Sequence, residues 1–333
     1  MARSATGMKI TVLGAGAWGT ALARMLASRG HAITLWDHFP ATLETIRRTG
    51  RNERYLPGVD LPSELGLEPE ASRAVDGAEL VVVASVSRAF RSVTACLGSF
   101  EGLVVSVTKG IEFETGLTMS GVLHQTAPRA RVVALSGPSL ALEVARGVPT
   151  AVVAASEDTD AARLVQSLFH GPTFRVYTSG DLLGVELGGA LKNVFAIAAG
   201  VCDGLGFGDN SKAALVTRAI AEMRRLGVAC GARAETFSGL SGIGDLMVTC
   251  FSPLSRNRQF GERLGRGESV EQILQTMTAV AEGYPTARAA YALARRLQVE
   301  TPIIDEVYAM LYQAKDVRRS AQDLLARESK PED

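Results

Sequence analysis

Three glycines near the start of the chain have the spacing of a phosphate-binding turn. Gly14, Gly16 and Gly19 follow a short apolar run, and a helical pattern begins at Thr20. In such a turn the first glycine permits the tight bend, the second lets the backbone approach a pyrophosphate, and the third lets the helix pack on the strand. The helix N-terminus then offers free N–H groups to the phosphates. The alternative is an ordinary turn between a strand and a helix.

A second apolar run, residues 31–36, ends in Asp37 and His38. These two residues lie about 20 positions after the glycine turn, where dinucleotide-binding folds place the residue that contacts the ribose. The two features together favour a dinucleotide site over an ordinary turn.

A lysine in an apolar helix is the first candidate for acid–base chemistry. Residues 184–195 predict this helix, and Lys192 lies among its apolar residues. Gly188 and Gly189 each cost up to ~1 kcal/mol in a helix relative to alanine, which indicates that another group approaches the backbone closely. Desolvation lowers the pKa of a lysine toward the range where it exchanges protons near neutral pH. The alternative is a lysine whose ammonium reaches solvent.

Polar residues further along the chain are candidates for the same site. Asp245, within a glycine-rich stretch, is placed to orient that lysine or to accept a substrate hydroxyl, and capping of the next helix is the alternative. Ser255, Arg256 and Asn257 open a predicted helix. They fit a phosphate site, or else form a polar helix N-terminus in solvent.

The elements that position these residues alternate between strands and helices in the first half of the chain. Apolar runs predict strands at 10–13, 31–36, 80–84, 103–107, 131–135, 149–154 and 173–177. This order predicts a doubly wound, mostly parallel, Rossmann-like sheet of the α/β class. Ligands bind outside the carboxyl ends of such strands, where Lys109, Gly137 and Ser139 lie, as do Gly14 and Asp37.

From about residue 181 the pattern becomes helical. Helices are expected at 181–200, 211–230, 255–265, 268–277, 286–297 and 303–313. We therefore expect a dinucleotide-binding Rossmann domain at 8–185 and a mostly α-helical, substrate-binding C-terminal domain at 186–325.

Composition narrows the class of protein. Of 333 residues, 47% are hydrophobic and 21% charged, and the net charge is +0, which argues against nucleic acid as a partner. The four cysteines lack C-x-x-C spacing and the four histidines lack metal-ligand spacing, so we expect no disulfide framework and no metal site. We see no cleavable leader and no run near the ~18 apolar residues of a membrane helix. We expect a cytoplasmic protein that is not embedded in the membrane.

The motifs, in this order and spacing, resemble those of bacterial NAD(P)-dependent glycerol-3-phosphate dehydrogenases over residues 8–325. They are GAGAWGTALA (14–23), TKG (108–110), SGPS (136–139), GVELGGALKNVFAIAAG (184–200), GLSGIGDLMVTC (239–250), SRNRQFG (255–261) and VAEGY (280–284). The resemblance implies reversible reduction of dihydroxyacetone phosphate to sn-glycerol 3-phosphate by NAD(P)H. The product supplies phospholipid synthesis, and we expect the reaction to need no metal. It also implies a cytoplasmic homodimer.

The resemblance implies a role for each matching residue. Lys192 matches the proton-transfer lysine, and Lys109 matches the lysine that touches both cofactor and substrate. Asp245 matches a residue of the substrate pocket, and we expect it to act in catalysis with the two lysines, which also contact the substrate. Further substrate contacts are implied for Gly137, Ser139, Ser255, Arg256 and Asn257. Cofactor contacts are implied for the glycine turn and for Ala17, Trp18, His38, Tyr55, Ala141, Arg256, Val280 and Glu282.

Two positions depart from the family pattern. Ala17 stands where many members have serine, and Asp37 stands where members often have glycine. Asp37 favours the ribose hydroxyls of NAD, whereas a protonated His38 favours NADP, so the sequence leaves the cofactor preference open. Two alternative functions also stay open. One is a related reductase of non-phosphorylated hydroxy or keto acids, and the other is a module that senses NAD(P)H without turnover.

Overall fold

The computed structural model describes residues 7–277, 280–328 and 331. The described chain divides into two compact units. Unit 1 comprises the chain up to Lys109 together with Leu117–Glu186, and unit 2 comprises Gly110–Gly116 together with the chain from Leu187 onward.

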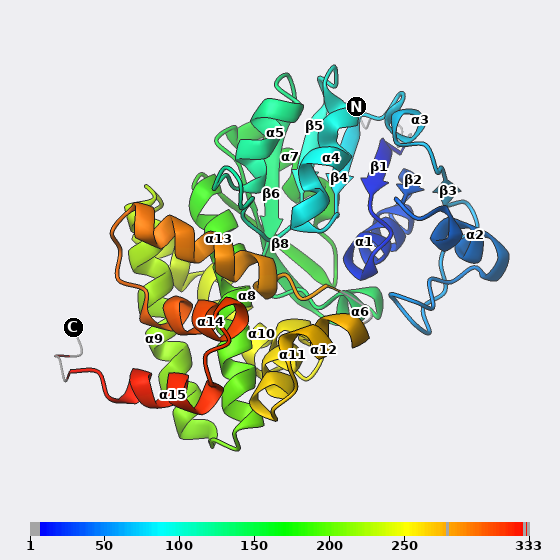
Figure 1. Cartoon of the computed structure of the whole chain (residues 1–333). Helices are drawn as coiled ribbons and strands as arrows, with labels where there is room; N and C mark the ends of the chain where they lie inside the picture. The colour runs from blue at the N-terminus through cyan, green and yellow to red at the C-terminus, as the bar shows by residue number, and fades with distance from the viewer. Residues whose placement is uncertain (1–6, 278–279, 329–330, 332–333) are drawn as a thin grey trace. The chain divides into compact units, whose positions relative to one another are not determined.

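Unit 1 is built on an eight-stranded sheet (Figure 1). Its strands are β1 (Lys9–Leu13), β2 (Ala32–Trp36), β3 (Gly66–Leu67), β4 (Leu80–Val83), β5 (Leu103–Ser106), β6 (Arg131–Ser136), β7 (Thr150–Ala155) and β8 (Phe174–Ser179). The strand order is β3-β2-β1-β4-β5-β6-β7-β8, and every neighbouring pair is parallel except β6 and β7. The predicted Rossmann-like, mostly parallel sheet is confirmed. The short edge strand β3 was not predicted.

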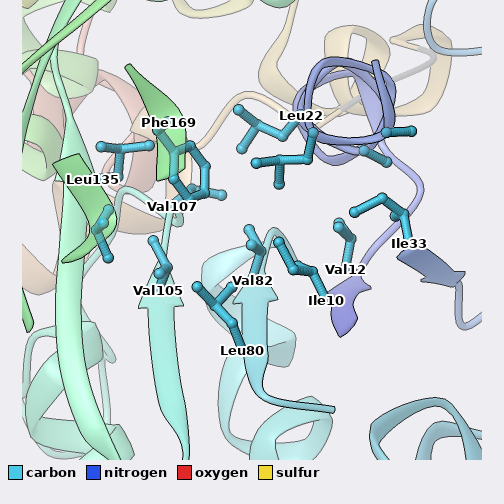
Figure 2. Packing of buried hydrophobic residues seen from close by; sticks show 14 of the residues in the cluster. Ile10, Val12, Leu22, Ile33, Leu80, Val82, Val105, Val107, Leu135 and Phe169 are labelled. Carbon is cyan, nitrogen blue, oxygen red and sulfur yellow. The ribbon is translucent and has the colours of Figure 1, made fainter. Parts of the chain in front are cut away.

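Helices cover both faces of this sheet because its strands are apolar on both sides. In β4, Leu80 and Val82 belong to one hydrophobic cluster, and Val81 and Val83 belong to another. The first cluster includes residues of α1 (Ala17–Ala27), α2 (Pro40–Thr49) and α7 (Thr159–Phe169). Figure 2 shows its packing, from Ile33 and Leu22 to Phe169.

The second cluster lies on the opposite face. It includes residues of α3 (Ala71–Val75), α4 (Phe90–Thr94) and α5 (Met119–Thr126), together with the short 3₁₀ turn Ala95–Leu97. A second 3₁₀ turn, Ser87–Ala89, precedes α4, and α6 (Ala141–Ala145) lies between β6 and β7. Because the two clusters cover both faces, this unit has the layered architecture of a doubly wound fold.

Unit 2 is helical. After α8 (Leu182–Gly204) it contains α9 (Asp209–Ala229), α10 (Asp245–Phe251), α11 (Arg256–Gly265), α12 (Val270–Thr276), α13 (Gly283–Arg296), α14 (Pro302–Tyr312) and α15 (Val317–Leu325). A 3₁₀ turn spans Ala234–Ser238 and a single π-helical turn spans Leu240–Gly244. The expected helices are confirmed, with ends that differ by a few residues. The glycine-rich stretch before Asp245 forms this π-helical turn, which runs directly into α10.

One helix has the length and composition of a membrane span. Residues Leu182–Gly204 of α8 pass that test, so the expectation that no stretch would approach one was wrong. The apolar window of α8 is 94% buried within the protein, however, which is the burial of a core helix. The protein therefore has no membrane span among its described residues.

Candidate active site

The glycine turn between β1 and α1 has the geometry that its spacing predicted. Gly14 has φ +117°, a conformation that L side chains rarely adopt. A Cβ on Gly19 would lie 1.9 Å from the carbonyl oxygen of Gly14, so only glycine allows the helix to pack this closely. A Cβ on Gly16 would meet nothing within 4 Å, which leaves open space beside the backbone.

The turn fits the phosphates of a dinucleotide. Gly16 is the N-cap of α1 and no side chain caps this helix, so its N-terminus can bind an anion. The Trp18 indole nitrogen is buried without a hydrogen-bond partner in the protein. Ala17 and Trp18 are the first two residues of α1.

Side chains from two other segments hold the middle of the turn. The Ala15 N–H donates to Asp37 Oδ2 at 2.8 Å, and the Ala15 carbonyl accepts from Asn52 Nδ2 at 2.8 Å. Asn52 also donates to Thr20 Oγ1 at 2.8 Å. Sequence reasoning missed Asn52, because an asparagine in a loop carries no signal of its partner 37 positions away.

Lys109, Gly137 and Ser139 do come together at one edge of the sheet, as predicted from the strand ends. Lys109 Nζ and Ser139 Oγ both donate to the Gly137 carbonyl oxygen, at 3.0 and 2.9 Å. Gly137 has φ +136°, which explains why glycine follows β6.

The other cofactor candidates of this unit lie on nearby segments of the chain. His38 follows β2 and is exposed, Ala141 begins α6, and the Tyr55 ring lies 5.2 Å from the Arg54 guanidinium.

In unit 2, Lys192 is buried and paired. It is 6% exposed, and its Nζ donates to Asp245 Oδ1 and, at 2.8 Å, to Thr249 Oγ1. The alternative in which the ammonium reaches solvent is therefore wrong. Thr249 in turn donates to the Asp245 carbonyl oxygen at 2.6 Å. This buried group of an ammonium, a carboxylate and a hydroxyl can hold and exchange a proton.

The π-helical turn explains both Asp245 and one of the glycines of α8. A Cβ on Gly188 would lie 2.7 Å from the Ser241 carbonyl oxygen, so the close approach that was predicted is made by this turn. The structure places Gly244 at the N-cap of α10 and Asp245 at its first helical position. Asp245 therefore faces Lys192 and is not the N-cap that the alternative interpretation expected.

The predicted phosphate residues are at the N-terminus of α11. Ser255 is the N-cap and accepts from the Arg258 N–H at 3.2 Å, and Arg256 is the first helical residue. Asn257 is 7% exposed and links two other elements, because it donates to Asn193 Oδ1 at 2.9 Å and accepts from the Gly283 N–H at 2.8 Å.

The last two cofactor candidates precede α13. Val280 lies just before this helix, and Glu282 is its N-cap.

Glycines bring α8 and α11 into close contact. A Cβ on Gly261 would lie 1.9 Å from the Ile197 carbonyl oxygen, and a Cβ on Gly200 would lie 2.0 Å from that of Arg258. The two helices therefore meet backbone to backbone. This contact fixes the start of α11 relative to Lys192 on α8.

Cysteine and metal chemistry have no support at this site. Burial raises the pKa of the Cys250 thiol to about 12 and that of Cys202 to about 11, so neither is a candidate nucleophile. Within the described part of the chain no three His, Cys, Asp or Glu side chains group as metal ligands would.

Comparison with known proteins gives matches along most of the chain. Residues 9–162 match the family model described as NAD-dependent glycerol-3-phosphate dehydrogenase N-terminus, and residues 181–322 match the model of its C-terminus. The glycerol-3-phosphate dehydrogenase (NAD(P)+) of Anaeromyxobacter dehalogenans (strain 2CP-C) is 50% identical over 98% of this chain and 100% of its own. That of Chlorobium phaeobacteroides (strain BS1) is 47% identical over 98% of this chain and 99% of its own.

A solved structure shows the same fold. The crystal structure of glycerol-3-phosphate dehydrogenase from Coxiella burnetii superposes with a TM-score of 0.94 at 36% identity. The match covers 97% of this chain and 100% of that one.

Proposed function

Since the chain belongs to the NAD-dependent glycerol-3-phosphate dehydrogenase family and interconverts dihydroxyacetone phosphate and glycerol 3-phosphate with NAD(P), we propose that Lys192 transfers the proton in this reaction. The observation that carries this proposal is the buried ion pair of Lys192 with Asp245. A buried ammonium is costly to keep for stability alone, because its desolvation offsets much of the gain from pairing.

The bound reduced nicotinamide supplies the hydride that reduces the substrate carbonyl. Lys192, as an ammonium, donates a proton to the oxygen of that carbonyl, and in the reverse direction its neutral amine accepts the proton from the alcohol. Asp245 and Thr249 hold Nζ in place from the first two turns of α10. Lys109 contacts both cofactor and substrate, as the family resemblance implies.

The substrate phosphate is assigned to the start of α11. Arg256 supplies the positive charge, and the Ser255 hydroxyl can still donate while its oxygen caps the helix. Asn257 is mostly committed to its links with Asn193 and Gly283, and it keeps one amide hydrogen for the phosphate. Binding of this remote group orients the carbonyl for reaction.

The cofactor residues follow from the same resemblance. The glycine turn with Ala17 and Trp18 holds the pyrophosphate, and its open space at Gly16 supports this assignment. The remaining cofactor contacts are assigned to His38, Tyr55, Lys109, Ala141, Arg256, Val280 and Glu282. Gly137 and Ser139 are assigned to the substrate, as the same resemblance implies.

Oxidation of NADH and NADPH by the purified protein tests this function. We expect turnover with dihydroxyacetone phosphate and very little with dihydroxyacetone. Arg256→Ala should raise KM for dihydroxyacetone phosphate by about 10- to 100-fold, because it removes a charge-assisted hydrogen bond. Arg266→Ala, which removes an exposed arginine of the same segment, is the matched control and should leave KM unchanged.

Two results would contradict the assignment. A reductase of non-phosphorylated acids would keep its activity in Arg256→Ala and would prefer hydroxy or keto acids as substrates. A sensing module would bind the cofactor and turn over neither compound.

The family resemblance also supports a cytoplasmic homodimer that supplies glycerol 3-phosphate to phospholipid synthesis. Light scattering of the purified protein should give twice the mass of the chain. A mass equal to that of one chain would overturn the dimer and leave the reaction untouched.

A further inference from the structure

Asp37 lies at the position that contacts the cofactor ribose in dinucleotide-binding folds, yet its carboxylate already accepts hydrogen bonds from two backbone N–H groups. Oδ2 accepts from the Ala15 N–H at 2.8 Å and Oδ1 accepts from the Phe39 N–H at 2.9 Å. The residue is only 8% exposed. These contacts fix the side chain in one orientation against the glycine turn.

The Ala15 peptide is held on both sides. The Ala15 N–H donates to Asp37 Oδ2, and Asn52 Nδ2 donates to the Ala15 carbonyl oxygen, both at 2.8 Å. Ala15 lies between Gly14 and Gly16, so these two side chains help to hold the middle of the turn, together with Thr20 Oγ1, which donates to the same carbonyl oxygen at 3.2 Å. Loss of the Asp37 contact therefore loosens the segment that holds the pyrophosphate, whichever dinucleotide binds.

The same carboxylate can distinguish the two dinucleotides. A carboxylate has about four lone-pair positions, and Asp37 uses two of them on backbone N–H groups. The ribose of NADH presents hydroxyl donors to the remaining positions. The 2′-phosphate of NADPH presents acceptor oxygens of the same charge as Asp37, which the fixed carboxylate repels.

The segment after Asp37 supplies no arginine or lysine to offset this charge. The first basic side chains after Asp37 in sequence, apart from His38, are Arg47 and Arg48 in the last turn of α2. Arg47 is paired with Glu44 at 2.5 Å. An NADP site instead places an arginine near this strand end. His38 is exposed, and its ring lies edge-on to the Phe39 ring, with the two ring centroids 5.0 Å apart.

We propose that Asp37 both positions the glycine turn and selects NADH over NADPH. This inference rests on the proposed NAD(P)-dependent function. It goes beyond that function because it assigns the 2′-position of the cofactor to a residue where the family pattern often has glycine.

Binding measured without substrate tests the proposal. The chain has two tryptophans: Trp18 is the second residue of α1, just after the N-cap Gly16, and Trp36 directly precedes Asp37. Quenching of their fluorescence therefore reports NADH and NADPH binding directly. The wild type should bind NADH at least tenfold more tightly than NADPH. In Asp37→Asn this preference should fall at least tenfold, and NADH binding and Tm should both decrease.

Two further variants serve as a control and as a repeat of this measurement. Glu44→Gln removes an exposed carboxylate of α2 and should change neither the preference nor Tm. Asp37→Ser, which has a smaller side chain and also removes the charge, repeats the measurement if the asparagine variant is unstable. Loosening of the turn weakens both dinucleotides equally, so only a change in their ratio reports selection at the 2′-position.

Equal or tighter binding of NADPH by the wild type would overturn the proposal, as would a ratio that neither Asp37 variant changes. A loss of NADPH binding alone in His38→Gln would assign the 2′-position to His38 and overturn it too. A protein that fails to reduce dihydroxyacetone phosphate would contradict the proposed function but not this inference, because the dissociation constants of NADH and NADPH are measured without substrate.

Discussion

At the residue scale, Lys192 is the side chain whose surroundings demand an explanation. Its ammonium is buried with one carboxylate and one hydroxyl, both from α10. A pair of this kind is often no more stabilising than apolar side chains of the same size, because both charges lose their water. Its retention in the protein therefore points to proton transfer, the task that needs an ammonium held in one orientation.

Thr249 is the part of this group that a conservative substitution can probe. Thr249→Val removes the hydroxyl that accepts from Lys192 at 2.8 Å and keeps the shape of the side chain. We expect kcat to fall about tenfold or more, since a hydrogen bond from a charged group contributes about 1.5 kcal/mol to holding Nζ in place. The matched control is Thr217→Val, because the Thr217 hydroxyl likewise donates to the carbonyl four residues earlier but is exposed. Equal kcat values in Thr249→Val and Thr217→Val would show that the Thr249 hydroxyl does not help to position Lys192.

At the element scale, buried carboxylates hold the N-termini of two helices. Glu186 accepts from the Ser120 N–H at 2.7 Å and from Ser120 Oγ at the start of α5. Glu222 accepts from the N–H groups of Ile303 and Ile304, at 2.9 and 2.8 Å, at the start of α14. A negative charge at a helix N-terminus is favourable, but burial opposes it. Burial accordingly raises the pKa of Glu186 above its ordinary value.

The Glu222 carboxyl predicts a pH-dependent stability. Burial, followed by the charge of Asp305, raises its pKa to about 7 against the backbone N–H groups and Arg225, which lower it. A raised pKa means that the folded state binds the proton more tightly than the unfolded state. This contribution to stability is complete below pH ~4.5, the ordinary pKa of a glutamic acid, and is lost as the pH rises through about 7.

Urea unfolding of the wild type and Glu222→Gln at pH 5 and pH 8 checks this. The glutamine stays neutral, so the difference in unfolding free energy between the two proteins should shift by up to about 3 kcal/mol in favour of the variant at the higher pH. A difference that is the same at both pH values would show that Glu222 titrates normally.

The contact between α8 and α11 predicts a large effect from a single methyl group. Gly261→Ala places a Cβ 1.9 Å from the Ile197 carbonyl oxygen, so the helices must separate. We expect a loss of about 1–3 kcal/mol in unfolding free energy and a lower kcat, because the start of α11 moves relative to Lys192. Gly208→Ala is the control, since nothing lies within 4 Å of its Cβ. Wild-type stability in Gly261→Ala, measured by urea unfolding, is the contrary result.

At the scale of the whole molecule, the chain crosses between its two units at three points, the last one inside α8 between Glu186 and Leu187. The short segment Gly110–Gly116 belongs to unit 2, where the Arg288 guanidinium lies 3.7 Å from the Phe113 ring. The segment therefore lies along the chain between Lys109 and Leu117, which both belong to unit 1. Its assignment to unit 2 depends on contacts with α13 that sequence patterns do not reveal.

The features that sequence predicted are local ones. The glycine turn, the individual strands and the apolar surroundings of Lys192 each fit within one short window of residues. Asn52 and Thr249 were missed because their partners lie 37 and 57 positions away. The antiparallel pairing of β6 with β7 was missed as well, since apolar runs give no strand direction. The role of Asp37 in the turn needed the structure for the same reason, because Ala15 is 22 positions away.

The most direct test of the account is the rate of dihydroxyacetone phosphate reduction by Lys192→Arg beside Lys192→Met. Arginine keeps a positive charge beside Asp245 but does not release its proton near neutral pH, and methionine keeps the length of the side chain without a proton. With NADH binding retained, the account predicts that both variants lose at least about 10²-fold in kcat, the size of a general acid contribution. Turnover within tenfold of the wild type in either variant would contradict proton transfer by Lys192.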